Sequence, residues 1–187
     1  CWALACVWSV SRWCVGMLLS VTMADVGVAG IVAAIGETLQ PAASQNGGKL
    51  SVVPSSHTLL ADQRHLKRVI TNLVVNAIKA SPGGHVLLGA RDLGATVTID
   101  ILDNGTGINP DDQARIFDRF VQLEQKKSSG PAGLGLGRSI VADLCHLMAM
   151  AIELRSTPGK GTHFRITADK IDRREIGAVP TAPAPEV

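Results

Sequence analysis

The stretch from Asp62 to Ser81 constrains the fold most strongly, because its apolar residues recur at helical spacing. Asp62 is suited to cap the start of a helix, and the sequence from Ser81 to Gly84 is suited to end it. We therefore expect one amphipathic helix with a stripe of apolar residues against the core. The residues of this predicted stripe are Leu66, Val69, Ile70, Leu73, Val74 and Ala77.

A second stripe of the same helix is polar and contains His65, Arg68, Asn72, Asn76 and Lys79. One interpretation is an ordinary solvated face. The other is a row of donors and acceptors for a polar ligand, because asparagine is a mediocre helix former. An amide oxygen can coordinate magnesium, and a lysine can neutralise a phosphate.

Composition limits the function. The 187 residues suffice for one domain with a core and a tail. A net charge of +2, without a basic run among aromatic residues, predicts no nucleic-acid partner. The cysteines lack metal-ligand spacing, which indicates reduced thiols of a cytosolic protein and no zinc site. They are Cys1, Cys6, Cys14 and Cys145.

The chain divides into three parts. Residues 1–24 are apolar apart from Arg12, and we interpret them as a linker or the remnant of a preceding element. Residues 25–168 are expected to form the domain, beginning with a helix over 25–40 that Pro41 ends. Residues 169–187 are charged and then rich in Pro and Ala, which is typical of a linker or tail.

Alternating apolar residues predict strands, including a hairpin around Asp92-Leu93-Gly94 and another near the end of the domain. Parity puts Asp103 on the apolar face of its strand, where a carboxylate is costly unless something binds it. Asp103 could form an Asx turn, or it could accept from a ligand that the following glycines allow to approach. The predicted strands are Lys49 to Val53, His85 to Arg91, Thr96 to Asp103, Ile152 to Arg155 and Thr162 to Thr167.

The region after Asp103 combines glycines with a long connection. We expect a short helix over 110–120, a polar loop over 121–137 and a helix from Arg138 to Met150. Glycines before a helix leave backbone N–H groups free for an anion. A Rossmann loop is not indicated, because no strand directly precedes these glycines.

Taken together, these motifs resemble the ATP-binding catalytic domain of sensor histidine kinases, in the GHKL superfamily with Hsp90, gyrase B and MutL. The resemblance covers roughly residues 25–168, and Pro158 to Phe164 resembles the usual closing hairpin. The motifs in order are Asn72 to Lys79 (N box), Asp103 to Ile108 (first glycine box), Phe117-Asp118-Arg119-Phe120 (F box) and Gly133-Leu134-Gly135-Leu136-Gly137 (second glycine box).

The resemblance implies a Bergerat ATP-binding fold: a two-layer α/β sandwich whose mixed, largely antiparallel sheet is covered by helices on one face. It implies that Asn76 holds Mg²⁺, that Asn72 and Lys79 act with it at the phosphates, and that Asp103 accepts from the adenine amino group. It also implies nucleotide contacts from Gly105, Gly107, Ile108, Phe117, Phe120, Lys126, Lys127, Gly133, Leu134, Gly135, Leu136 and Gly137.

The implied reaction is transfer of the γ-phosphoryl group of ATP to a histidine in two-component signalling. No histidine of this chain is followed by an acidic residue, as the family's acceptor usually is. We therefore expect the acceptor on a separate phosphoacceptor and dimerisation domain, with a response regulator receiver domain as the next partner. The resemblance implies a cytoplasmic domain that reaches a membrane only through a longer parent protein.

The sequence departs from the family at Ala80, where an aromatic residue is common, and at Gln122 and Arg138. Ala80 and Gln122 keep open a catalytically inactive nucleotide-binding regulatory module. A serine kinase of the anti-sigma-factor type is a second alternative, because it shares the fold.

Overall fold

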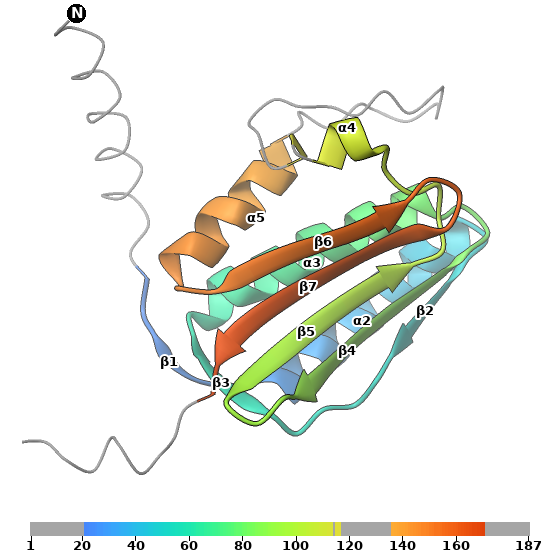
Figure 1. The fold of residues 1–187 in the computed structure, drawn as a ribbon. Helices are drawn as coiled ribbons and strands as arrows, with labels where there is room; N and C mark the ends of the chain where they lie inside the picture. Colours follow the sequence, from blue (N-terminus) through green and yellow to red (C-terminus); the bar gives the residue numbers. More distant parts are fainter. Residues whose placement is uncertain (1–20, 114, 117–135, 171–187) are drawn as a thin grey trace, which may run out of the picture.

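The computed structural model describes residues 21–113, 115–116 and 136–170, without the side chains of 136, 138 and 139. A five-stranded sheet of order β2-β4-β5-β7-β6 carries the helices on one face (Figure 1). This is the predicted two-layer α/β sandwich. The elements are β1 (Ala24–Gly27), α2 (Val28–Gln45), β2 (Lys49–Val52), β3 (Thr58–Ala61), α3 (Gln63–Ala80), β4 (His85–Asp92), β5 (Thr96–Asp103), α4 (Pro110–Gln113), α5 (Leu136–Leu147), β6 (Ala151–Thr157) and β7 (Gly161–Asp169).

The sheet is mixed, as expected. The short edge strand β2 pairs with β4 in parallel, and the other neighbours pair antiparallel. The central pair β5 and β7 runs in register from Thr96 opposite Asp169 to Asp103 opposite Thr162. This register brings the end of β5 beside the closing hairpin of β6 and β7.

Helix α3 forms as predicted, and all six residues of its apolar stripe are buried. Asp62 caps it, because its Oδ1 accepts from the backbone N–H groups of Arg64 at 2.9 Å and His65 at 3.2 Å. Its Oδ2 accepts from the backbone N–H of Thr22 at 2.9 Å. These contacts fix the start of the helix against the segment that leads into β1.

The first helix differs from the prediction at both ends. It begins at Val28 rather than at residue 25, because residues 24–27 pair with β3 instead. Pro41 lies inside it and is exposed, so the helix loses one hydrogen bond but continues to Gln45. The burial of Ala43 and the bonds from Gly47 and Gly48 to the last turn stabilise this extension.

The small sheet of β1 and β3 was not predicted, because each of its strands is only 4 residues long. Helix α5 also differs, since it spans 136–147 rather than 138–150. Its last residue, Leu147, is apolar but 38% exposed. None of the described helices is both long and apolar enough to cross a membrane.

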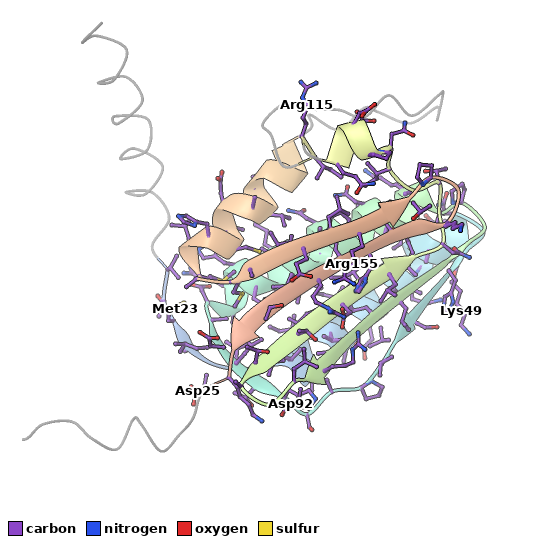
Figure 2. All side chains as sticks on the ribbon, viewed as in Figure 1. Met23, Asp25, Lys49, Asp92, Arg115 and Arg155 are labelled. Carbon is purple, nitrogen blue, oxygen red and sulfur yellow. The ribbon has the colours of Figure 1, made fainter. Side chains whose placement is uncertain are left out.

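The sheet face away from the helices carries a buried carboxylate, Asp100 of β5. Its oxygens accept from Arg91 Nη2 at 2.8 Å and Arg165 Nε at 2.8 Å, and contact His163 Nε2 at 2.6 Å. Burial alone would raise the pKa of Asp100, but these partners hold it at about 2. Figure 2 shows Arg155 of β6 on the same face.

Replacing Asp62 tests the cap of α3. Asp62→Ala should lower the free energy of unfolding by about 1–2 kcal/mol, as loss of an N-cap does. The hydrogen bond from Thr22 is the main cause that lowers the pKa of Asp62 to about 2 from its usual 3.8. Its stabilisation is therefore present above about pH 4 and is lost as the pH falls towards 2.

Urea unfolding at neutral pH and along an acid series measures both effects. Asp25→Ala, which removes an exposed carboxylate of β1, is the matched control. Equal losses in the two variants, or an unchanged acid dependence in Asp62→Ala, would contradict the assignment of the cap.

Candidate functional site

The centre of the candidate site is Asp103, the last residue of β5, whose side chain is buried as predicted. Its Oδ1 accepts from the backbone N–H of Gly105 at 2.9 Å, from Thr162 N–H at 3.2 Å and from Ser81 Oγ at 3.3 Å. Its Oδ2 accepts no hydrogen bond from the residues that the structure describes. Burial is the main influence on this carboxyl group and raises the pKa of Asp103.

The structure confirms one interpretation of Asp103 at Oδ1, and the ligand interpretation stays a prediction for Oδ2. The bond from Gly105 to Oδ1 is an Asx turn, which the sequence offered as the plain alternative. Oδ2 remains free to accept from a ligand.

The polar stripe of α3 contains exposed, half-buried and buried residues. Arg68 and Lys79 are exposed, and Asn72 and Asn76 are half-buried. No hydrogen bond joins the side-chain amide of either asparagine to another described residue. Their amide groups are therefore free to meet a ligand.

His65 does not belong to this wet face, although the sequence placed it there. It is buried, because Val69 one turn further along α3 packs into the core on the same side. Its Nε2 has no hydrogen-bond partner. His65 therefore lies inside the fold rather than on the polar face.

The end of α3 packs directly against the loop after Asp103. The backbone N–H of Thr106 donates to the carbonyl oxygen of Ala80 at 3.1 Å. A Cβ on Gly105 would collide with that same carbonyl group and with Ser81 Oγ. Since Asn76 lies one turn before Ala80, about 6 Å along the axis, the amides and Asp103 belong to one rigid arrangement.

The structure requires the glycines of this loop for close packing, and their predicted role towards a ligand stays a prediction. We expected Gly105 and Gly107 to let a ligand approach the backbone. At Gly107, φ is +67° and a Cβ would meet the backbone of Thr157. Both glycines are thus explained by close packing against the chain's own backbone.

The loop is also tied to the closing hairpin at Ile108, which is buried. Ile108 N–H donates to Ser156 Oγ at 2.9 Å, and that hydroxyl donates to the carbonyl oxygen of Gly161 at 2.9 Å. The Nε2 of Gln113 in α4 donates to the carbonyl oxygens of Ile108 at 2.9 Å and Ser156 at 3.1 Å. These bonds hold the 104–109 loop on β6 and β7.

Several predicted contacts fall outside the described residues. Of the second glycine box, the structure describes the backbone of Leu136 and Gly137, which form the first turn of α5 instead of preceding the helix. The remaining predicted residues are not described, and their roles stay predictions. They are Phe117, Phe120, Lys126, Lys127, Gly133, Leu134 and Gly135.

Sequence reasoning missed two residues that contact Asp103. Ser81 was interpreted only as the stop of α3, and Thr162 only as part of a strand. Both lie within the described core and are buried. A signal for Ser81 was available, because a small hydroxyl at the end of the N box is a natural partner for a buried acceptor from the next motif.

With this geometry in place, comparison with known proteins identifies the class. Residues 61–171 match the family described as histidine kinase-, DNA gyrase B-, and HSP90-like ATPase. The match spans more than half of the chain, so the chain belongs to this family. Within it, the chain contains an ATP-binding catalytic domain of the type found in sensor histidine kinases, as the resemblance implied.

The sequence relatives are sensor kinases. The sensor-like histidine kinase SenX3 of Mycolicibacterium smegmatis is 37% identical over 115 residues, which cover 61% of this chain and 30% of that protein. The alginate biosynthesis sensor protein KinB of Pseudomonas aeruginosa is 41% identical over 107 residues, covering 57% of this chain and 17% of that protein. The chain therefore spans less than a third of the length of these relatives.

Solved structures of other proteins have a similar fold. Full-length ShkA in complex with AMPPNP superposes with a TM-score of 0.70 at 30% identity, covering 82% of this chain and 32% of that one. The mycobacterial sensor histidine kinase MprB superposes with a TM-score of 0.66 at 24% identity, covering 80% of this chain and 98% of that one, which supports the fold.

A pair of glycines in the closing hairpin tests how tightly β7 packs on Asp103. At Gly161, φ is +101° and a Cβ would collide with the carbonyl group of Asp103. At Gly159, φ is +74° but no atom lies within 4 Å of a Cβ. Gly159→Ala should therefore lose only about 1–2 kcal/mol from backbone strain. Gly161→Ala should lose about 1–3 kcal/mol more from overpacking.

Urea unfolding of the two variants measures the difference. Equal losses of unfolding free energy would contradict the close contact between Gly161 and Asp103.

Proposed function

We propose that this domain binds ATP with the adenine amino group donating a hydrogen bond to Oδ2 of Asp103. The observation that carries the proposal is the Asp103 carboxylate. Its Oδ1 accepts from three donors, and its Oδ2 accepts from none of the described residues. An amino group is a donor that fits this acceptor. The AMPPNP complex of ShkA supports an adenine nucleotide as the ligand of this fold.

The half-buried amides of Asn72 and Asn76 are proposed to meet the phosphate end of the nucleotide, with Lys79 contributing positive charge. Among the described residues, no three His, Cys, Asp or Glu side chains come together as a metal site. Mg²⁺ commonly keeps several waters and is shared between few protein ligands and phosphate oxygens. The amide oxygen of Asn76 as a protein ligand fits that mode of binding.

The proposed activity is phosphoryl transfer from ATP to a histidine of a separate phosphoacceptor and dimerisation domain. A response regulator receiver domain is proposed as the next acceptor of the phosphoryl group. ATP supplies the γ-phosphoryl group. The contribution of this chain is positioning and charge: Asp103 fixes the base, and the α3 amides and Lys79 fix the phosphates. The sensor kinases among its relatives support this proposal. We propose a cytoplasmic location, with membrane attachment only through a longer parent protein.

The reaction is tested by adding a histidine-kinase phosphoacceptor hairpin and labelled ATP to this chain. Acid-labile phosphate on the hairpin is expected. Acid-stable phosphate on a protein substrate would favour the serine-kinase alternative. Nucleotide binding without any transfer would favour the inactive regulatory module.

Asp103→Asn is a sharp test of adenine recognition. The carbonyl oxygen of the new amide can keep all three donors of Oδ1, while its NH₂ group replaces Oδ2 and donates instead of accepting. ATP affinity should fall at least about tenfold, the equivalent of one hydrogen bond to a charged group. Inosine triphosphate carries a carbonyl oxygen in place of the amino group, so its binding should weaken less or improve.

Calorimetric titration with ATP and with inosine triphosphate measures this change in nucleotide preference. The control is Asp25→Asn on exposed β1, which should bind like the wild type. Because burial raises the pKa of Asp103, acid should also weaken ATP binding in the wild type as Oδ2 is protonated. Unchanged ATP affinity in Asp103→Asn would overturn the role of Asp103.

Asn76→Ala tests the metal proposal. Wild-type binding of an ATP analogue should tighten with magnesium, and this gain should disappear in Asn76→Ala because the amide ligand is lost. Titrations with and without magnesium measure it. Lys67→Ala, an exposed change on the same helix, is the control. A magnesium gain that survives in Asn76→Ala would place the metal on other residues.

A further inference from the structure

Three donors hold Oδ1 of Asp103, and they come from three different parts of the fold. Gly105 and Thr162 donate through backbone N–H groups, whereas Ser81 donates through its side chain. Ser81 is therefore the member of the described set that substitution can remove without changing the backbone. Its side chain is buried, with 4% of the residue exposed.

The position of Ser81 is fixed independently of Asp103. It forms the C-cap of α3, where its backbone N–H donates to Ile78 at 3.3 Å and its carbonyl oxygen accepts from Gly84 at 3.0 Å. Within the described residues, the hydroxyl of Ser81 makes one hydrogen bond, which it donates to Asp103 Oδ1 at 3.3 Å. A rigid cap thus directs one donor at one oxygen of the carboxylate.

This arrangement limits the orientation of the carboxylate. If Oδ1 lost the Ser81 hydroxyl, Gly105 and Thr162 would still donate to it, but the plane of the carboxylate could tilt further about the Cβ–Cγ bond, since torsions of this kind have broad minima. With the hydroxyl in place, Oδ1 is matched to three donors and Oδ2 alone is left to accept. The same bond also opposes the effect of burial on the pKa of Asp103.

We propose that Ser81 is a positioning residue for base selection: its hydroxyl orients Asp103 so that Oδ2 accepts from an adenine amino group and rejects a 6-oxo base. This inference rests on the proposed function, because it assigns Ser81 a role in the base recognition proposed for Asp103. It also links α3, which carries Asn72 and Asn76, to the choice of base.

The test compares the affinity of the whole chain for ATP and for inosine triphosphate in wild type, Ser81→Ala and Asp103→Asn. The preference for ATP should fall about two- to tenfold in Ser81→Ala, the equivalent of one ordinary hydrogen bond. A structural role alone would weaken both nucleotides equally and leave their ratio unchanged. Carboxyl NMR titration of Asp103 should show a higher pKa in Ser81→Ala, because a bond that favours its charged form is gone.

Two further variants keep the test decisive. Ser81→Cys preserves most of the buried volume but has a weak S–H donor, so it should lose the preference even if Ser81→Ala unfolds. Ser51→Ala removes a hydroxyl that contacts His85 at the edge of the sheet and should keep the wild-type ratio.

The outcomes separate the two proposals. A wild type that binds both nucleotides equally would overturn base recognition by Asp103 itself. A wild type that prefers ATP, with the preference lost in Asp103→Asn but retained in Ser81→Ala and Ser81→Cys, would overturn only the role of Ser81.

Discussion

The burial of the Asp103 carboxylate is the constraint that joins the parts of this domain. A carboxylate at the end of a central strand is tolerated only when donors replace the water it has lost. Those donors come from the cap of α3, from the loop after β5 and from the start of β7. The helix, the sheet and the closing hairpin must all be in place for the carboxylate to be satisfied. The same carboxylate that completes the fold keeps one oxygen without a donor from the described residues.

Much of this could be predicted because the signals were local and periodic. The apolar stripe and the Asp62 cap determine α3 by themselves, and strict alternation determines β5 up to Asp103. The mixed sheet followed from the family that the order of the motifs indicated, and the family match confirms that family. The residue roles in nucleotide and metal binding rest on the same motifs and stay predictions.

The misses share a different cause, which is tertiary context. The pairing of β1 with β3 joins two short segments far apart in sequence, and neither has a pattern of its own. Helix α2 continues past Pro41 because Ala43 packs in the core, a gain that the local proline signal does not reveal. Asp100 is buried on the outer face of the sheet because arginines from β4 and β7 fold over it. The sequence marked Ser81 only as the end of α3, because its hydrogen-bond partner Asp103 lies 22 positions away.

The register of β5 against β7 has a consequence for evolution of the chain. Asp103 and Thr162 are separated by 59 positions, yet a hydrogen bond joins them. The segment between them, which contains α4, α5, β6 and their connections, therefore has its two ends fixed side by side. The entropy of closing such a loop grows only with the logarithm of its length, and doubling it costs about 0.6 kcal/mol. Insertions between the first glycine box and the closing hairpin are therefore thermodynamically cheap. A longer connection there would leave the hydrogen bond between Thr162 and Asp103 in place.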